Sequence, residues 1–216
     1  MRRLFCTLLF FFSLLSVAQT CTDSTFFATA IPDSIWTRMQ GKTYHQNDYI
    51  QRSDLRYLRL QYMDFEGKER VGEMVCNRAI ADDLLDIFRQ LYVARYPIER
   101  IQLPDDFDAD DEQQMRANNT SCFCFRVIKG SSKLSAHARG LAVDLNPLYN
   151  PCVKTRRDGT LFIQPSTAAP YVDRSRRFVH KIDRQDLAYR LFVQHGFSWG
   201  GAWRSSKDYQ HFEKDK

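Results

Sequence analysis

Two histidines in this sequence stand near acidic residues at spacings that suit metal chemistry. His137 precedes Asp144 by seven positions, and His211 lies far along the chain, three positions after Asp208. From Gly140 onward apolar residues alternate with others, which predicts a short strand whose second face carries Asp144. Gly140 permits the turn that brings the His137 imidazole back toward that carboxylate. We therefore expect at least two of these side chains to converge.

A set of two histidines and one carboxylate is typical of a catalytic zinc site with one open position. We expect His137, Asp144 and His211 to hold Zn²⁺, which lowers the pKa of a bound water from about 15.7 toward ~7. Asp208 is then close enough to act as general base and to pass the proton to a leaving amine. The set predicts hydrolysis of a peptide bond. The alternative is a hydrogen-bonded pair of His137 and Asp144 in a turn, without a metal.

Other clusters of polar residues suit structural roles. His45, His180 and His195 are interpreted as structural or surface residues. Residues 105–112 hold six carboxylates, but they lack the Gly and Glu that an EF-hand loop needs, so acidic residues in the first turn of a helix are the better interpretation. Two basic clusters are interpreted as solvated surface: residues 154–157 and 174–177.

The composition excludes several classes of protein. The chain has 216 residues, of which 44% are hydrophobic and 26% charged, as in ordinary globular proteins. Its 31 basic and 26 acidic residues give a net charge of +5. These charges are dispersed, whereas a nucleic-acid-binding protein normally carries a clustered basic face. We therefore expect no nucleic-acid partner and no obligate protein partner.

The first 18 residues are predicted to be a signal peptide. A basic start is followed by an apolar run that is too short to span a bilayer, and residues 16–18 offer a cleavage site. The mature chain would have 216 − 18 = 198 residues. It would be exported to the periplasm or the cell exterior, with no stable membrane insertion after cleavage. Five cysteines would remain, so at least one stays free.

Hydrophobic patterning predicts a mixed α+β domain over residues 54–216, preceded by an irregular N-terminal extension over residues 19–53. Two strands are expected around the Glu66-Gly67 turn, and apolar residues recur at helical spacing from Ile80 to Leu91. Further elements are expected as follows: a strand over 122–128, a functional loop or lid over 147–183, a helix over 184–195, and short strands near 197–199 and 209–212.

The segment SAHARGLAVD, residues 135–144, and the later DYQH, residues 208–211, resemble the signature of the zinc D-alanyl-D-alanine carboxypeptidase family. That signature is SxHxxGxAxD, followed later by an acidic residue, two spacers and His. Residues 196–213 resemble more narrowly the branch that contains L-alanyl-D-glutamate endopeptidases of phage endolysins and bacterial wall enzymes. Weaker similarity covers residues 72–88 and 118–126, so the resemblance spans most of the mature chain.

The resemblance implies roles for individual residues. It implies that His137, Asp144 and His211 bind zinc and that Asp208 is the general base. The short Asp208 matches the endopeptidase branch, because the carboxypeptidase branch usually has Glu there.

Three further residues are implied to contact substrate. Arg126 aligns with an arginine that stabilises charge on the scissile carbonyl, and a surface arginine is the alternative. Ser135 matches a serine near the substrate backbone, and a turn hydroxyl is the alternative. Trp203 is expected to line the cleft together with Trp199, for which core packing is an equal alternative.

The resemblance also implies a fold and an activity. The fold would be a small antiparallel sheet flanked by helices, shared with the hedgehog signalling domain. The activity would be hydrolysis of peptidoglycan stem peptides, at a terminal D-alanine or, as residues 196–213 favour, at the L-alanyl-D-glutamate bond. The alternative is a non-catalytic, zinc-containing module that binds the cell wall or takes part in signalling.

Overall fold

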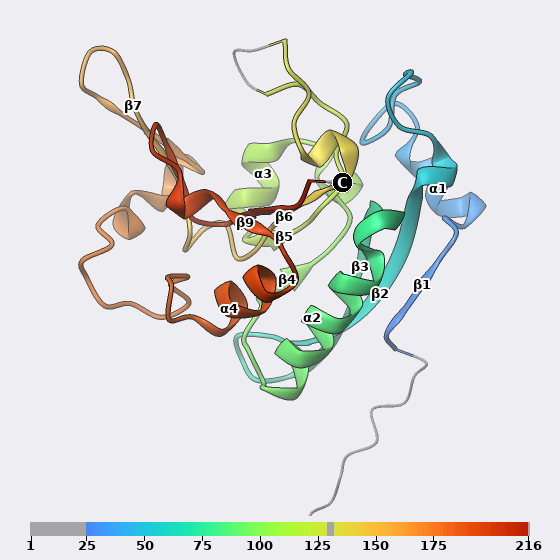
Figure 1. Ribbon diagram of the computed structural model, residues 1–216, viewed down its shortest axis with the longest axis horizontal. Helices are drawn as coiled ribbons and strands as arrows, with labels where there is room; N and C mark the ends of the chain where they lie inside the picture. The colour runs from blue at the N-terminus through green and yellow to red at the C-terminus, as the bar shows by residue number, and fades with distance from the viewer. Residues whose placement is uncertain (1–24, 129–131, 216) are drawn as a thin grey trace, which may run out of the picture.

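The computed structural model of the chain describes residues 25–128 and 132–215. The predicted signal peptide over residues 1–18 lies outside these ranges. The described chain combines helices with several small, mostly antiparallel sheets, which confirms the predicted α+β class (Figure 1). None of the described helices is long and apolar enough to cross a bilayer.

The central scaffold is a long antiparallel hairpin of β2 (Leu55–Met63) and β3 (Glu69–Asn77). Its register runs from Leu55 opposite Asn77 to Met63 opposite Glu69, around the predicted Glu66-Gly67 turn. Asp64 closes this turn because its carboxylate accepts the backbone N–H groups of Glu66 and Lys68. The hairpin confirms the two strands expected here.

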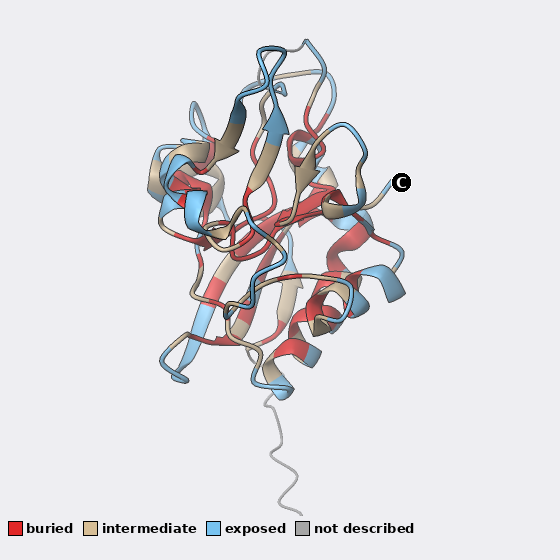
Figure 2. Ribbon diagram, turned by 90° about the vertical axis from the view of Figure 1, so that its left-hand side faces the viewer, coloured by how far each residue is buried: buried red, intermediate tan, exposed pale blue. Residues whose placement is uncertain are grey.

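Helix α2 (Ala81–Val93) covers one face of this hairpin (Figure 1). The helix buries the predicted apolar stripe, including Leu84 and Phe88, against alternate strand residues such as Leu58 and Met74. Asn77 caps the short turn that leads into the helix, since its side chain accepts the N–H of Ala79. Burial of these apolar side chains is the main stabilising contribution. Figure 2 shows the resulting buried interior between helix and sheet.

The opposite face of the hairpin is covered by the N-terminal segment. The sequence predicts no regular element in residues 19–53, but the structure has strand β1 (Phe27–Thr29) and helix α1 (Asp33–Met39) there. β1 pairs with β2, and Met39 packs with Tyr57 and Val75 in a second core. The hairpin is therefore buried on both faces near its Leu55–Asn77 end, whereas Arg59 and Val71 farther along are exposed, which explains why its strands alternate only loosely in hydrophobicity. The division into domains at residue 54 stays a prediction.

The remaining elements surround this scaffold. The other helices are α3 (Asp111–Arg116) and α4 (Leu187–Gln194). One sheet has the order β6 (Ala142–Asp144), β11 (His211–Glu213), β9 (Ser198–Trp199). Another has the order β10 (Lys207–Asp208), β7 (Cys152–Thr155), β8 (Leu161–Gln164). A parallel pair joins β4 (Arg100–Ile101) to β5 (Asn119–Thr120). Short 3₁₀ helices are η1 (Arg52–Asp54), η2 (Arg78–Ile80), η3 (Pro104–Phe107), η4 (His137–Arg139), η5 (Ser166–Tyr171) and η6 (Gly200–Ala202).

One expectation about local structure was wrong. Residues 122–128 form no continuous strand, because their backbone bonds go to different partners: Phe123 N–H donates to Val75 and Cys124 N–H donates to His137. Residues 147–183, expected to form a functional loop or lid, contain the β7–β8 hairpin and a 3₁₀ helix, and their role stays a prediction. The acidic cluster does start a helix, since Asp110 caps α3 and accepts the N–H of Gln113.

The cysteines described by the structure are all free thiols. Cys76, Cys122 and Cys124 are buried, and Cys152 is half-buried. The first three therefore behave as small apolar core residues. Cys6 and Cys21 lie outside the described residues.

Asp186 provides a test of pH-dependent stability in the scaffold. It caps α4 and accepts a hydrogen bond from Tyr96 Oη at 3.2 Å, and burial raises its pKa to about 6. Between about pH 4 and 6 the folded state therefore holds this proton more tightly than the unfolded chain does, so stability falls as the pH rises through this window.

Asp186→Asn keeps the cap and the acceptor for Tyr96 but cannot titrate. We predict that the variant gains about 1–2 kcal/mol relative to the wild type between pH 4 and pH 6.5. Urea unfolding at several pH values measures this difference. Parallel stability curves for the two proteins would contradict the prediction.

Candidate metal centre

Two neighbouring strands place an aspartate and a histidine side by side. β6 and β11 pair antiparallel with Asp144 directly opposite His211. Residues in opposed positions project from the same face of the sheet, with Cβ atoms about 4.5–5.5 Å apart. The two side chains therefore meet although they are far apart in the sequence.

A glycine turn brings the third side chain to the same point. His137 begins η4, which ends at Gly140 in the left-handed conformation with φ of 65°. A Cβ atom at Gly140 would lie 2.6 Å from the backbone nitrogen of Asn77. The same Asn77 holds the turn, because its backbone N–H donates to Gly140 O and its side chain donates to Arg139 O. The end of β3 therefore fixes the position of His137.

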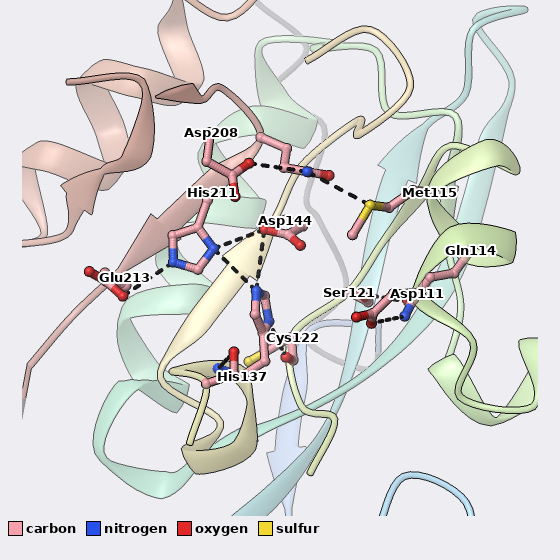
Figure 3. A network of polar contacts seen from close by, with 12 residues as sticks. Asp111, Gln114, Met115, Ser121, Cys122, His137, Asp144, Asp208, His211 and Glu213 are labelled. Atoms are coloured by element: carbon pink, nitrogen blue, oxygen red, sulfur yellow. Dashed lines mark hydrogen bonds and ion pairs between the residues drawn. The ribbon is translucent and has the colours of Figure 1, made fainter. Parts of the chain in front are cut away.

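The three side chains converge in a compact triangle (Figure 3). His137 Nε2 lies 3.2 Å from His211 Nδ1 and 3.3 Å from Asp144 Oδ1, and His211 Nδ1 lies 3.1 Å from the same Oδ1. The exposed fractions of the three residues are only 5%, 7% and 6% for His137, Asp144 and His211. Water therefore competes little for these atoms.

The hydrogen bonds on the outer side of each imidazole determine what the inner nitrogens offer. His137 Nδ1 lies 2.7 Å from the carbonyl of Cys122, and His211 Nε2 lies 3.2 Å from Glu213 Oε2. Only a ring N–H can donate in these two contacts. In its neutral form each histidine thus presents a lone pair inward, toward the other histidine and toward Asp144.

Three acceptor atoms at this separation repel one another unless a cation lies between them. Without a metal a proton takes that part: burial lowers the pKa of His211, but its bonds to Asp144 and Glu213 outweigh burial and raise it to about 10. For Asp144 burial acts in the opposite direction and raises the pKa. The two histidines outweigh burial and hold the pKa of this carboxyl well below its usual range.

The donor set and its spacing suit a zinc ion. Ligands about 2.0–2.1 Å from a tetrahedral zinc lie about 3.3 Å from one another, close to the separations seen here. Nitrogen and carboxylate donors of this kind also match zinc chemically. Each histidine has the outer hydrogen bond that metal-ligating imidazoles normally make.

Asp208 stands beside the triangle without being part of it (Figure 3). Its Oδ1 accepts a hydrogen bond of 3.1 Å from Gln210 Nε2, and the Cys152 thiol donates to the same carboxylate. Burial, and next the charge of Asp144, raise the pKa of Asp208. Gly200 makes room for this arrangement, because a Cβ there would lie 2.6 Å from Asp208 O and 3.2 Å from His211 Cβ.

The triangle opens into a pocket of about 580 Å³. Arg126, Ser135 and Trp203, which the sequence singled out as substrate contacts, all line it. The Arg126 guanidinium forms an ion pair of 2.7 Å with Asp111, and the ring of Trp203 lies 5.2 Å from that of His211. Ser135 is buried and its hydroxyl accepts the N–H of His137 at 3.3 Å.

The other residues considered in the sequence lie elsewhere. Trp199 is buried in the main core, which agrees with core packing, one of the two alternatives given for it. His195 pairs with Asp86 on the surface, and His180 stacks on Phe65.

Sequence reasoning did not find several residues of the site. Glu213 and Gln210 flank His211 in the chain, and alternation along β11 places Glu213 on the same face as His211. That signal was available. Asp111 and Cys152 reach the pocket only through the packing of α3 and the pairing of β7 with β10, which no local pattern reveals.

Glu213 allows a test of the outer hydrogen bond. Glu213→Gln removes the negative charge beside His211 Nε2 and leaves the three ligands in place. We predict that zinc affinity falls about 10- to 100-fold, as is typical when such a partner is lost. Competition with a fluorescent chelator measures this change. The control is Glu66→Gln in the distant β2–β3 turn, and an equal zinc affinity in both variants would argue against the role.

Comparison with known proteins shows a similarity for the segment that carries the three ligand residues. Residues 129–214 match the family model described as D-alanyl-D-alanine carboxypeptidase. The match includes the three residues of the triangle together with Asp208, Ser135 and Trp203, but not Arg126. No curated protein and no solved structure matches the chain significantly. The three residues of the histidine–aspartate triangle therefore lie in a segment that is similar to the D-alanyl-D-alanine carboxypeptidase family, while part of the pocket wall comes from residues before that segment.

Proposed function

We propose that the protein is an exported, zinc-dependent peptidase that hydrolyses peptidoglycan stem peptides. The observation that carries the proposal is the convergence of three buried ligand atoms in a pocket that the carboxylate of Asp208 also lines. His137, Asp144 and His211 would hold the ion. A bound zinc ion supplies activation of water and polarisation of the scissile carbonyl.

The protein's own groups keep the site ready for an ion. The carbonyl of Cys122 and the carboxylate of Glu213 fix the ring orientation of the two histidines, so their inner nitrogens stay unprotonated when a metal is present. Asp144 supplies one negative charge, so two neutral histidines and one carboxylate leave a divalent site with one net positive charge. That charge favours an anionic nucleophile.

Asp208 would move the proton. Its carboxylate lies at the pocket wall and is oriented by Gln210, so it can accept a proton from the attacking water and deliver it to the leaving amine. Because it is not part of the triangle, its replacement should leave metal binding intact.

Arg126, Ser135 and Trp203 would contact the substrate. A guanidinium held in place by Asp111 suits the negative charge that develops on the carbonyl oxygen. The indole of Trp203 offers an apolar face to the methyl groups of alanine residues. Ser135 would act mainly by fixing the backbone of His137, with its hydroxyl at the pocket wall.

The proposal includes location and bond preference. The predicted signal peptide supports action in the periplasm or outside the cell, where peptidoglycan lies. The short acid Asp208 and the sequence of residues 196–213 favour cleavage at the L-alanyl-D-glutamate bond over removal of a terminal D-alanine. Mass spectrometry of muropeptides incubated with the zinc-loaded protein distinguishes the two: a new amino terminus on glutamate supports the first, and loss of one alanine supports the second.

Asp208 provides the sharpest test of catalysis. We predict that Asp208→Asn lowers kcat at least 100-fold, because general acid–base transfer contributes about 10²–10⁴-fold. It should still bind one zinc ion per chain, as measured by metal analysis after dialysis. His137→Ala should lose both zinc and activity.

Two outcomes would contradict this assignment. Hydrolysis by Asp208→Asn at the wild-type rate would remove Asp208 from catalysis. A wild-type protein that binds zinc and wall peptides but releases no product would support the non-catalytic binding module instead.

A further inference from the structure

The β7–β8 hairpin forms one wall of the pocket. Its strands pair with Cys152 opposite Gln164 and Lys154 opposite Phe162, and all four residues line the pocket. Their side chains share a face because residues two apart on a strand point the same way. Arg156 follows β7 directly and also lines the pocket, whereas Arg157 does not. The basic cluster interpreted as solvated surface is therefore divided between pocket and solvent.

Charges of opposite sign occupy different parts of the pocket. Acidic groups lie in the triangle, as Asp144, and elsewhere in the pocket lining, as Asp111, Asp208 and Glu213. The cations lie on the walls, and Arg126 is already paired with Asp111. Among residues 25–128 and 132–215, no carboxylate forms an ion pair with Lys154 or with Arg156. Two cations that face the substrate space thus remain available for an anionic ligand.

Arg156 is held in position without an ion pair to any carboxylate that the structure describes. Its guanidinium lies 5.4 Å from the centre of the Phe162 ring and donates to the carbonyl of Leu161 at 3.2 Å. A guanidinium has five donors, so most remain free to bind a carboxylate. Lys154, one step closer to the metal triangle along the same face, adds a flexible second cation.

The pairing of strands shows which part of the substrate these cations would meet. Cys152 on β7 lies opposite Asp208 on β10. Lys154 is two residues further along β7, about 7 Å away on the same face. If Asp208 delivers the proton to the leaving amine, as proposed above, the residue that carries this amine lies on the hairpin side. The cations therefore face the leaving part of the peptide.

We propose that Lys154 and Arg156 form a carboxylate-binding wall that selects peptides with a free carboxylate on the residue after the scissile bond. This inference rests on the proposed function and specifies its substrate class. Such a carboxylate has two sources: the terminal carboxylate of a peptide that ends in D-alanine, or the free carboxylate of a glutamate at an L-alanyl-D-glutamate bond.

Matched pairs of peptides test the proposal with the full chain loaded with zinc. One pair ends in D-alanyl-D-alanine, as the free acid or as the carboxamide. The other contains an L-alanyl-D-glutamate bond, with the remaining glutamate carboxylate free or converted to the carboxamide. We predict that the wild type prefers the acid of one pair by about tenfold or more in kcat/KM, the effect of a charge-assisted hydrogen bond. The pair that shows the preference identifies the source.

Variants then assign the preference to the hairpin. Lys154→Gln with Arg156→Gln should remove the preference by raising KM for the acid about tenfold, with kcat and the carboxamide reaction unchanged. Arg157→Gln is the matched control on the same hairpin outside the pocket. Circular dichroism and zinc content check that the double variant is folded. The proposal would be overturned if the double variant lost kcat/KM equally for the acid and the carboxamide, or if its kcat/KM for the acid did not fall.

A binding measurement separates this inference from the proposed function. Isothermal titration of the metal-free protein with each peptide reports affinity without hydrolysis. Tighter binding of the acid that the double variant abolishes supports the carboxylate wall even if the zinc-loaded protein cleaves nothing, in which case only the proposed function fails. Cleavage without any preference for the acid leaves the function standing and refutes the wall. If the metal-free protein shows no preference for the acid and the zinc-loaded protein cleaves no peptide, both the carboxylate wall and the proposed function are refuted.

Discussion

The arrangement of the site depends on one electrostatic constraint: three buried acceptor atoms are held about 3 Å apart with little water to separate them. Such a cluster is unfavourable unless a cation or a proton occupies its centre. The fold must therefore resist the tendency of His137, Asp144 and His211 to move apart. It does so with a fixed strand register, a glycine turn and an outer hydrogen bond on each imidazole.

A few contacts of the scaffold hold the turn that carries His137 in place. Asn77 ends β3, caps the turn into α2 and binds the backbone on both sides of the Arg139–Gly140 peptide. The hairpin that carries Asn77 packs against α2 on one face and, near its Leu55–Asn77 end, against the N-terminal segment on the other. Rigid packing of this kind holds ligands within the narrow tolerances that a preorganised site needs. The second core is thus part of the support of the site, although it lies away from the pocket.

The sequence predicts the site better than it predicts the surroundings. Alternation after Gly140 correctly placed Asp144 opposite the core, and the pairing of β6 with β11 then brings it to His211. The β2–β3 hairpin and α2 followed from turn residues and helical spacing. Residues 25–53 form only a short strand and a short helix, too short for a sustained period in the sequence. Cys152 reaches Asp208 through a strand pairing that only the folded chain reveals.

The close approach of Gly200 to Asp208 and His211 has a consequence for how the protein tolerates variation. Any side chain at this position would displace two groups of the pocket at once, because its first carbon would already overlap a backbone oxygen. Gly201 is equally confined, since a Cβ there would lie 2.2 Å from the Trp199 ring. In saturation mutagenesis, substitutions at Gly200 and Gly201 should therefore reduce function as strongly as substitutions of the metal ligands do. The cause would be excluded volume alone, because neither glycine carries a functional group.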